Sequence, residues 1–192
     1  MDKQQQAYER AQAKKKVRGL IHVYTGDGKG KTTAALGISL RMIGYDRKVC
    51  IVQFIKGTWH YGELDAVNKH LSAYMEIIPA GKGFVGILGD NKPRSEHEQA
   101  AMEALELARQ KMQTGEYTLI VLDEINVAVS MGLIGVDDVL ALIKEKPEGL
   151  HLILTGRDAH PAIIEKADLV TEMKLIKHYF NKGIGAVKGM EY

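Results

Sequence analysis

A glycine-rich stretch with two reactive side chains stands near the start of the chain, Thr-Gly-Asp-Gly-Lys-Gly-Lys-Thr-Thr at residues 25–33. Glycines let the backbone turn so that successive N–H groups point at one anion. The ammonium of Lys31 can reach phosphate oxygens, and the hydroxyl of Thr32 can ligate a magnesium ion. The stretch predicts a polyphosphate site, contacted by Thr25, Gly26, Asp27, Gly28, Lys29, Gly30, Lys31, Thr32 and Thr33.

The flanks of this stretch favour the same interpretation. An apolar run, residues 20–24, precedes it, and a helical pattern begins at Lys31, which gives the strand, loop and helix of a phosphate-binding loop. The N-terminus of the helix adds positive charge. The usual loop has glycine where Thr25 stands, so the glycine frame is one residue shorter. We therefore expect the nucleotide to lie differently from that in a common ATPase. An ordinary turn before a helix is the alternative.

Two carboxylates, Asp123 and Glu124, follow the apolar run at residues 119–122. Carboxyl ends of strands in an open α/β sheet face the ligand crevice, so both side chains should lie near the phosphate loop. We expect them to hold magnesium together with Thr32, directly or through water. The alternative is that this pair merely begins a helix.

Two arginines are candidates for phosphate contacts. Arg157 follows an apolar run that ends at Thr155, and Arg41 lies on the helix that begins at Lys31. The alternative for Arg157 is a surface salt bridge. Periodicity alone predicts a solvated position for Arg41.

Two further segments carry aromatic groups without a phosphate motif. Residues 81–90 are glycine-rich but have no Gly-Lys-Thr, so we expect a flexible loop that presents Phe84 and Val85 to a large apolar ligand. Residues 53–63, which include Trp59, place aromatic and polar groups at the end of a strand. The seven histidines show no metal-ligand spacing.

The chain alternates apolar runs with helical patterns from Gly19 onward. Continuous apolar runs are typical of strands buried on both faces of a parallel sheet, so the pattern predicts a doubly wound α/β domain. The expected strands are 20–24, 48–54, 74–78, 118–122, 150–155 and 169–175, and the expected helices are 31–43, 61–71, 96–113, 137–145 and 161–167.

The helix at 96–113 carries the clearest local signals. Ser95 and Glu98 have the spacing of a capping box, and Gly115 should stop the helix. Helical spacing places one apolar face on the core, formed by Ala101, Leu105, Ala108 and Met112.

Charge and cysteine content exclude several classes of protein. The net charge is +2, but residues 1–18 carry +4, which leaves −2 for residues 19–192 and argues against a basic nucleic-acid platform. We expect 1–18 to be a basic arm, either a mobile tail or a lid, and 19–192 a single domain. The single Cys50 excludes a disulfide framework and favours a buried, inert thiol in the cytoplasm. We expect neither a membrane span nor a signal peptide.

Several stretches together closely resemble the P-loop type of ATP:corrinoid adenosyltransferase. They are 25–35, Val-Gln-Phe-Ile-Lys-Gly-Thr-Trp at 52–59, Leu-Asp-Glu at 122–124, Thr-Gly-Arg at 155–157, Lys-His at 177–178 and the final Gly-Met-Glu-Tyr. The likeness runs from about Gly19 to Tyr192. It implies a P-loop NTPase-like, mostly parallel sheet flanked by helices.

The resemblance implies transfer of the 5′-deoxyadenosyl group of ATP to the Co(I) of a reduced corrinoid, with inorganic triphosphate as the other product. By resemblance Lys31, Thr32 and Arg41 act on the leaving triphosphate, and Thr32 with Glu124 holds magnesium, or manganese in its place. Trp59 and Phe84 would contact the corrinoid. Phe84 matches one of two bulky groups that displace the lower axial ligand. The second, a tryptophan in the family, is Gly86 here.

The resemblance also implies a homodimer and a flavodoxin-like reductant. Two other functions stay open at this point, an ATP-binding regulatory module and an ordinary ATPase or phosphotransferase. The motif at 52–59 favours the adenosyltransferase, because the phosphate loop alone does not discriminate among the three.

Overall fold

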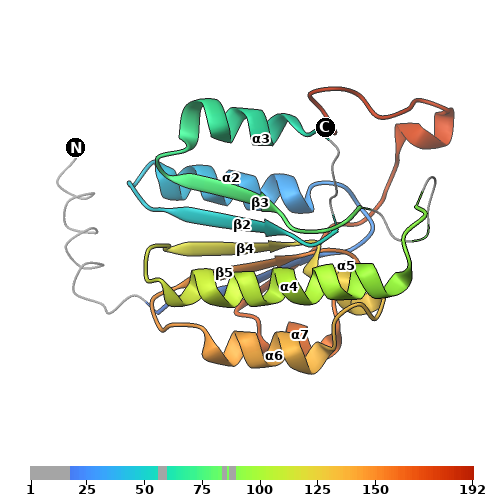
Figure 1. Cartoon of the computed structure of the whole chain (residues 1–192). Coiled ribbons are helices and arrows are strands. Elements are labelled where there is room, and N and C mark those ends of the chain that lie inside the picture. Colours follow the sequence, from blue (N-terminus) through green and yellow to red (C-terminus); the bar gives the residue numbers. More distant parts are fainter. Residues whose placement is uncertain (1–17, 56–59, 84–85, 87–89) are drawn as a thin grey trace.

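A single parallel sheet forms the centre of the molecule. The structure is a computed structural model that describes residues 18–55, 60–83, 86 and 90–192. Its six strands lie in the order β3-β2-β4-β5-β1-β6, and all neighbours pair in parallel (Figure 1). The bounds are β1 Ile21–Thr25, β2 Val49–Gln53, β3 Met75–Pro79, β4 Leu119–Asp123, β5 His151–Thr155 and β6 Leu169–Glu172. Every expected strand is confirmed, although β6 ends three residues earlier than expected.

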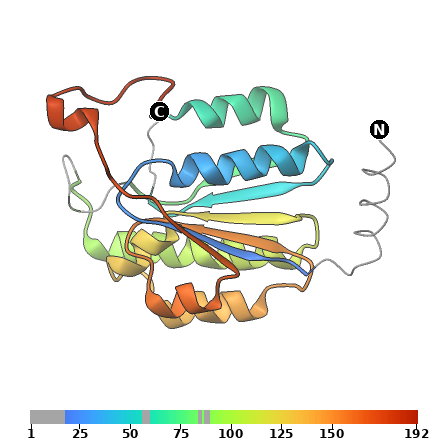
Figure 2. The same ribbon diagram turned by 180° about the vertical axis from the view of Figure 1, so that it is seen from behind.

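Helices cover both faces of the sheet, as Figures 1 and 2 show from opposite sides. One layer holds α2 and α3, and the other holds α4 to α7. The bounds are α2 Lys31–Ile43, α3 Gly62–Ala66, α4 Arg94–Gln113, α5 Ile125–Ser130, α6 Val136–Glu145 and α7 Pro161–Lys166, with a π-helical turn η1 at Val67–Leu71 and a 3₁₀ turn η2 at Tyr179–Lys182. The doubly wound α/β architecture is therefore confirmed.

Burial on both faces explains why the strands read as continuous apolar runs. Every residue of β2 and β4 is buried. Alternate side chains of these strands pack on α2 with η1 and on α4 with α5 and α6. Cys50 is fully buried on β2, so the expected burial of this residue is confirmed, and that burial raises the pKa of its thiol. None of the described helices is long and apolar enough to cross a membrane.

The capping box expected for α4 is wrong. The helix begins at Arg94 after Pro93, which holds an extended conformation and caps without a side-chain hydrogen bond. Ser95 is thus already helical, and Glu98 accepts a hydrogen bond from Arg94 Nε at 2.7 Å. Arg94 also donates to the carbonyl of Met131 at 2.7 Å, which fixes the earlier start. The expected core face of α4 is confirmed, since all four apolar residues are buried.

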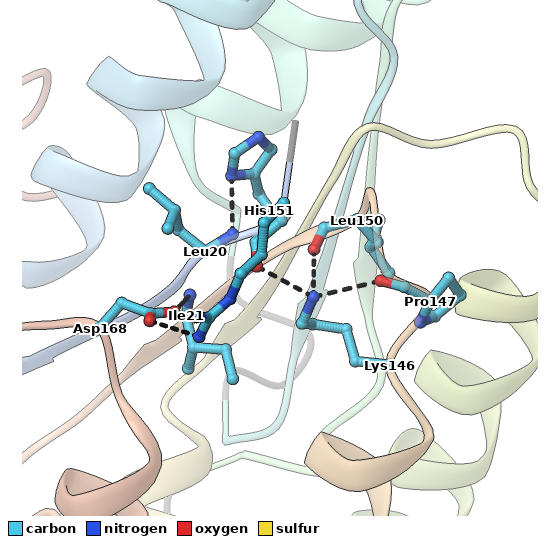
Figure 3. A network of polar contacts seen from close by, with 9 residues as sticks. Leu20, Ile21, Lys146, Pro147, Leu150, His151 and Asp168 are labelled. Carbon is cyan, nitrogen blue, oxygen red and sulfur yellow. Dashed lines mark hydrogen bonds and ion pairs between the residues drawn. The ribbon is translucent and has the colours of Figure 1, made fainter. Parts of the chain in front are cut away.

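The amino edge of the sheet is tied together by a polar network (Figure 3). Lys146 Nζ donates to three carbonyl oxygens, those of Gly19 at 3.1 Å, Pro147 at 3.1 Å and Leu150 at 2.7 Å. His151 Nδ1 accepts a hydrogen bond from the Leu20 N–H at 3.1 Å. These contacts join the residues just before β1 to the turn that follows α6 and to the first residue of β5.

Asp168 completes the same network next to β6. Its carboxylate accepts hydrogen bonds from the Ile21 N–H at 2.9 Å and from Arg18 at 2.7 Å. Strand β6 itself lies at the edge of the sheet and is exposed along its whole length, including Leu169 and Val170 at 41% each.

Candidate active site

The phosphate loop follows β1 directly and opens into α2. Gly26 has φ of 92°, and Gly30, the N-cap of α2, has φ of 116°, conformations that favour glycine. A Cβ at Gly26 would lie 2.5 Å from the carbonyl oxygen of Met173, so close packing of the segment after β6 also requires glycine. The Gly28 N–H donates to that same carbonyl at 2.7 Å. One of the expected anion donors is therefore used by the main chain here.

Lys31 lies inside the loop rather than on its surface. Only 7% of the residue is exposed, and its Nζ donates to the carbonyls of Gly26 at 2.6 Å and Gly28 at 2.9 Å. Desolvation lowers the pKa of Lys31, and the nearby charge of Glu124 partly opposes that shift. A bound anion would raise the pKa of Lys31 and so favour the charged ammonium. This fits the phosphate contact that the sequence predicts for Lys31.

Asp123, at the end of β4, is the centre of a buried hydrogen-bond network. Its Oδ1 accepts from Thr32 Oγ1 and from Thr155 Oγ1, both at 2.8 Å, and its Oδ2 accepts from Gln53 Nε2 at 3.3 Å. Strand β5 lies between β1 and β4, so Thr155 spans the gap between the loop and the carboxylate. Because the proton of Thr32 points to Asp123, the lone pairs of that hydroxyl can face a cation.

Glu124 adopts a left-handed backbone conformation, with φ of 66°, and is the N-cap of α5. Its N–H donates to Thr155 Oγ1 at 2.9 Å. Non-glycine residues in this region store strain, which gathers at functional sites. The pair at 123–124 thus both ends a strand and precedes a helix, and the strand end places Asp123 against Thr32 as expected.

The two arginines differ in position. Arg157 lies beside the loop, with its Nε 3.9 Å from Asp27 Oδ1, although both side chains are mostly exposed. Arg41 lies in the last turn of α2, about 15 Å of helix axis from Lys31. Burial raises the pKa of Tyr24 on β1, and the charge of Arg41 partly opposes that shift. A contact of Arg41 with phosphate stays a prediction.

The two expected corrinoid contacts, Trp59 and Phe84, lie outside the described residues. The glycine-rich segment is nevertheless anchored to the same edge of the sheet. Its first residue, Gly81, donates its N–H to the carbonyl of Gln53 at 3.0 Å. At its other end Asp90 accepts from the Gly86 N–H at 2.8 Å and contacts His97 Nε2 at 3.1 Å.

Three residues of the site were missed by sequence reasoning. Gln53 and Thr155 are the last residues of β2 and β5, and Asp123 is the last residue of β4. Their positions at strand ends could therefore have identified them as site residues. Glu191 belongs to the final Gly-Met-Glu-Tyr that carries the family resemblance, but the sequence assigned it no role, and its Oε2 lies 2.9 Å from the Nζ of Lys29 in the phosphate loop.

The side chains present fit magnesium better than a transition metal. Among the described residues, no group of three His, Cys, Asp or Glu side chains could form a metal cage. The edge offers instead one threonine hydroxyl oriented by Asp123, with Glu124 beside it. Such a sparse oxygen set suits Mg²⁺, which keeps several waters and takes its other ligands from phosphates.

The fold and the loop at this edge define an α/β protein with the P-loop fold. Solved structures with the same fold include the flagellar accessory protein FlaH from Methanocaldococcus jannaschii, 15% identical with a TM-score of 0.52 over 81% of this chain and 72% of that one. A KaiC-like protein from Pyrococcus horikoshii is 17% identical with a TM-score of 0.50 over 84% of this chain and 75% of that one.

Sequence comparison places the chain within that class. The model of the family "ATP:corrinoid adenosyltransferase BtuR/CobO/CobP" matches residues 17–192. Corrinoid adenosyltransferases from Sinorhizobium sp. and Pseudomonas aeruginosa are 40% and 39% identical, each over 91% of this chain and over 81% and 84% of their own lengths. One from Escherichia coli K12 is 35% identical over 91% of this chain and 86% of its length. The chain belongs to the corrinoid adenosyltransferase family.

Proposed function

We propose that this protein transfers the 5′-deoxyadenosyl group of ATP to the Co(I) of a reduced corrinoid. The observation that carries the proposal is the joining of Lys31, Thr32 and Asp123 at one buried edge in a member of this family. The cobalt lone pair forms a bond to the ribose C5′, and the bond from C5′ to oxygen breaks. Triphosphate leaves with that electron pair, and no proton leaves the nucleophile, so the site needs no general base.

The residues of the loop act on the leaving triphosphate. Lys31 supplies a preorganised positive charge where negative charge develops, and loop N–H groups and the α2 N-terminus add to it. Arg157 would contact the same phosphates, a role that its position beside Asp27 of the loop supports. We assign Arg41 to them by resemblance. The resemblance also supports a reversed nucleotide, with the terminal phosphate deep in the loop and the ribose toward the corrinoid.

Magnesium would be held by the Thr32 hydroxyl and Glu124, with Asp123 orienting the hydroxyl. When bound, the ion supplies charge that stabilises the phosphate oxygens. The Thr155 hydroxyl keeps both carboxylate residues in register, because it donates to Asp123 and accepts from the Glu124 N–H.

The corrinoid would meet Trp59 and Phe84, by resemblance to the family. We further propose a homodimer, a flavodoxin-like electron donor and a cytoplasmic location. The exposed apolar side chains of β6 support self-association, since an open edge strand is a template for pairing with a second chain.

Mass spectrometry of the corrinoid product tests the proposal. The protein, MgATP and chemically reduced Co(I) cobalamin are incubated with ATP carrying ¹³C at C5′. We expect a corrinoid whose mass includes the labelled adenosyl group. An unchanged corrinoid, with the label retained in ADP, would assign the protein to the ordinary ATPases or phosphotransferases instead.

A further inference from the structure

Buried side-chain atoms without a hydrogen-bond partner gather at the carboxyl edge of the sheet. In the part of the chain that the structure describes, they are Oε1 of Gln53, both amide atoms of Asn126, and Oε1 of Glu191. Gln53 ends β2, Asn126 lies in the first turn of α5, and Glu191 pairs with Lys29 of the phosphate loop. Buried polar groups are rarely left unpaired, because the loss of hydration is then uncompensated. The pattern marks an edge that a polar ligand completes.

Gln53 is the member of this group whose geometry is best defined. It is 1% exposed and lies directly opposite Asp123 in the register of β2 and β4. Its Nε2 donates to Asp123 Oδ2 at 3.3 Å. The reverse amide orientation would place two oxygens against each other, so the donor must face Asp123. The amide oxygen therefore remains as an acceptor, beside the carboxylate that orients Thr32.

We propose that Gln53 is a positioning residue of the magnesium site. Its Nε2 holds Oδ2 of Asp123, which keeps Oδ1 available for Thr32 and Thr155. Its Oε1 accepts a hydrogen bond from a water of the magnesium ion. Such waters fit, because phosphates and carboxylates offer only acceptors, whereas Mg²⁺ retains several waters whose protons are strong donors. The inference rests on the magnesium site proposed above.

Calorimetric binding of ATP in the absence of corrinoid tests this role without turnover. Affinity is measured for wild type and Gln53→Met, with MgCl₂ and with excess EDTA. Methionine has a similar length and lacks both hydrogen-bonding groups. We expect the factor by which magnesium tightens ATP binding to fall by about tenfold in Gln53→Met, with binding in EDTA unchanged.

Two further variants separate positioning from packing. Val52→Ala, one residue earlier on the same buried strand, lowers stability by a cavity and should leave the magnesium factor at the wild-type value. Gln53→Leu also lacks the Nε2 donor and the Oε1 acceptor and should lose the factor in the same way, so it decides the question if Gln53→Met does not fold. A wild-type magnesium factor in Gln53→Met or in Gln53→Leu would overturn the role of Gln53. If the ATP affinity of the wild-type protein is the same with magnesium and with EDTA, that result would instead contradict the proposed metal site.

Discussion

Two lysines at opposite edges of the sheet, the buried Lys31 and the half-buried Lys146, make nearly the same contacts with different consequences. Each donates to main-chain carbonyls, and burial lowers the pKa of each. Lys146 directs its three N–H bonds at three carbonyls and joins the chain before β1 to the turn before β5. Lys31 makes two such bonds inside a loop of glycines, below a helix N-terminus.

The surroundings explain the difference. At the amino edge, Asp168 and His151 accept main-chain N–H groups, so the network closes on the protein itself. At the carboxyl edge, Glu124 has a left-handed backbone, and the amide oxygen of Gln53 has no hydrogen-bond partner among the described residues. A polar cluster is thus not by itself a functional site. Its incompleteness distinguishes the edge that we propose as the ligand site from the edge to which we assign only a structural role.

The largest effect should come from Lys31→Ala. Removal of the cation weakens stabilisation of the leaving triphosphate, and we expect a loss on the order of a hundredfold in the rate of the chemical step. Single-turnover adenosylation at saturating ATP and Co(I) corrinoid measures it. A near-normal rate would reject the role of Lys31 and erase the functional difference between the two lysines.

The matched change at the other edge is Lys146→Met, which keeps the aliphatic stem and deprives three carbonyls of a donor. We expect a loss of about 2 kcal/mol in the free energy of unfolding, with turnover per folded molecule unchanged. Urea unfolding and the adenosylation assay together check this. If Lys146→Met lost turnover while its free energy of unfolding stayed at the wild-type value, the amino edge would not have a purely structural role.

A smaller effect is expected for Glu124→Gln, which preserves shape and removes one charge. The magnesium concentration for half-maximal activity should rise by about tenfold, as for the loss of one charge-assisted contact. Glu116→Gln is the control, because Glu116 is exposed and precedes β4 at its opposite end. The ligand assignment fails if both variants show the wild-type magnesium titration.

The smallest effect concerns pH and the amino edge. Burial lowers the pKa of His151 below its ordinary value, and the charges of His22 and Lys146 lower it further. The folded state therefore binds fewer protons than the unfolded state between the two pKa values, so this contribution to stability is full above about pH 6.5 and declines as pH falls through the folded value. Protonation would also remove the acceptor of the Leu20 N–H.

His151→Asn keeps an acceptor near that N–H and cannot be protonated. The unfolding midpoint of this variant should depend less on pH between about 7 and 5 than that of the wild type. The residual dependence includes His22, whose pKa is also lowered by burial while Asp168 opposes the shift. Identical pH profiles for the two proteins would show that His151 does not titrate as its surroundings imply.

The elements that sequence reasoning found are those with strong local signals. Helix α2 begins and ends as expected, because Gly30 and Gly44 flank it. Helix α5 was missed, since its short apolar run resembles a continuation of β4. The capping box at Ser95 was wrong because Pro93 and the contacts of Arg94 begin α4 earlier.

The site was predictable as far as its motifs extend. The contact of Thr32 with Asp123 follows from the rule that the carboxyl ends of parallel strands lie at one edge of the sheet. The role of Thr155 as a bridge could not be predicted, because it depends on the position of β5 between β1 and β4. The pairing of Glu191 with Lys29 depends on the path of 173–192, which has no periodic pattern to predict it.

The most direct test of the central claim is ³¹P NMR of the phosphate products formed from MgATP, with and without a Co(I) corrinoid. We expect inorganic triphosphate in equal amount to the adenosylated corrinoid, and none when the corrinoid is omitted. ADP and orthophosphate formed whether or not the corrinoid is present would contradict it.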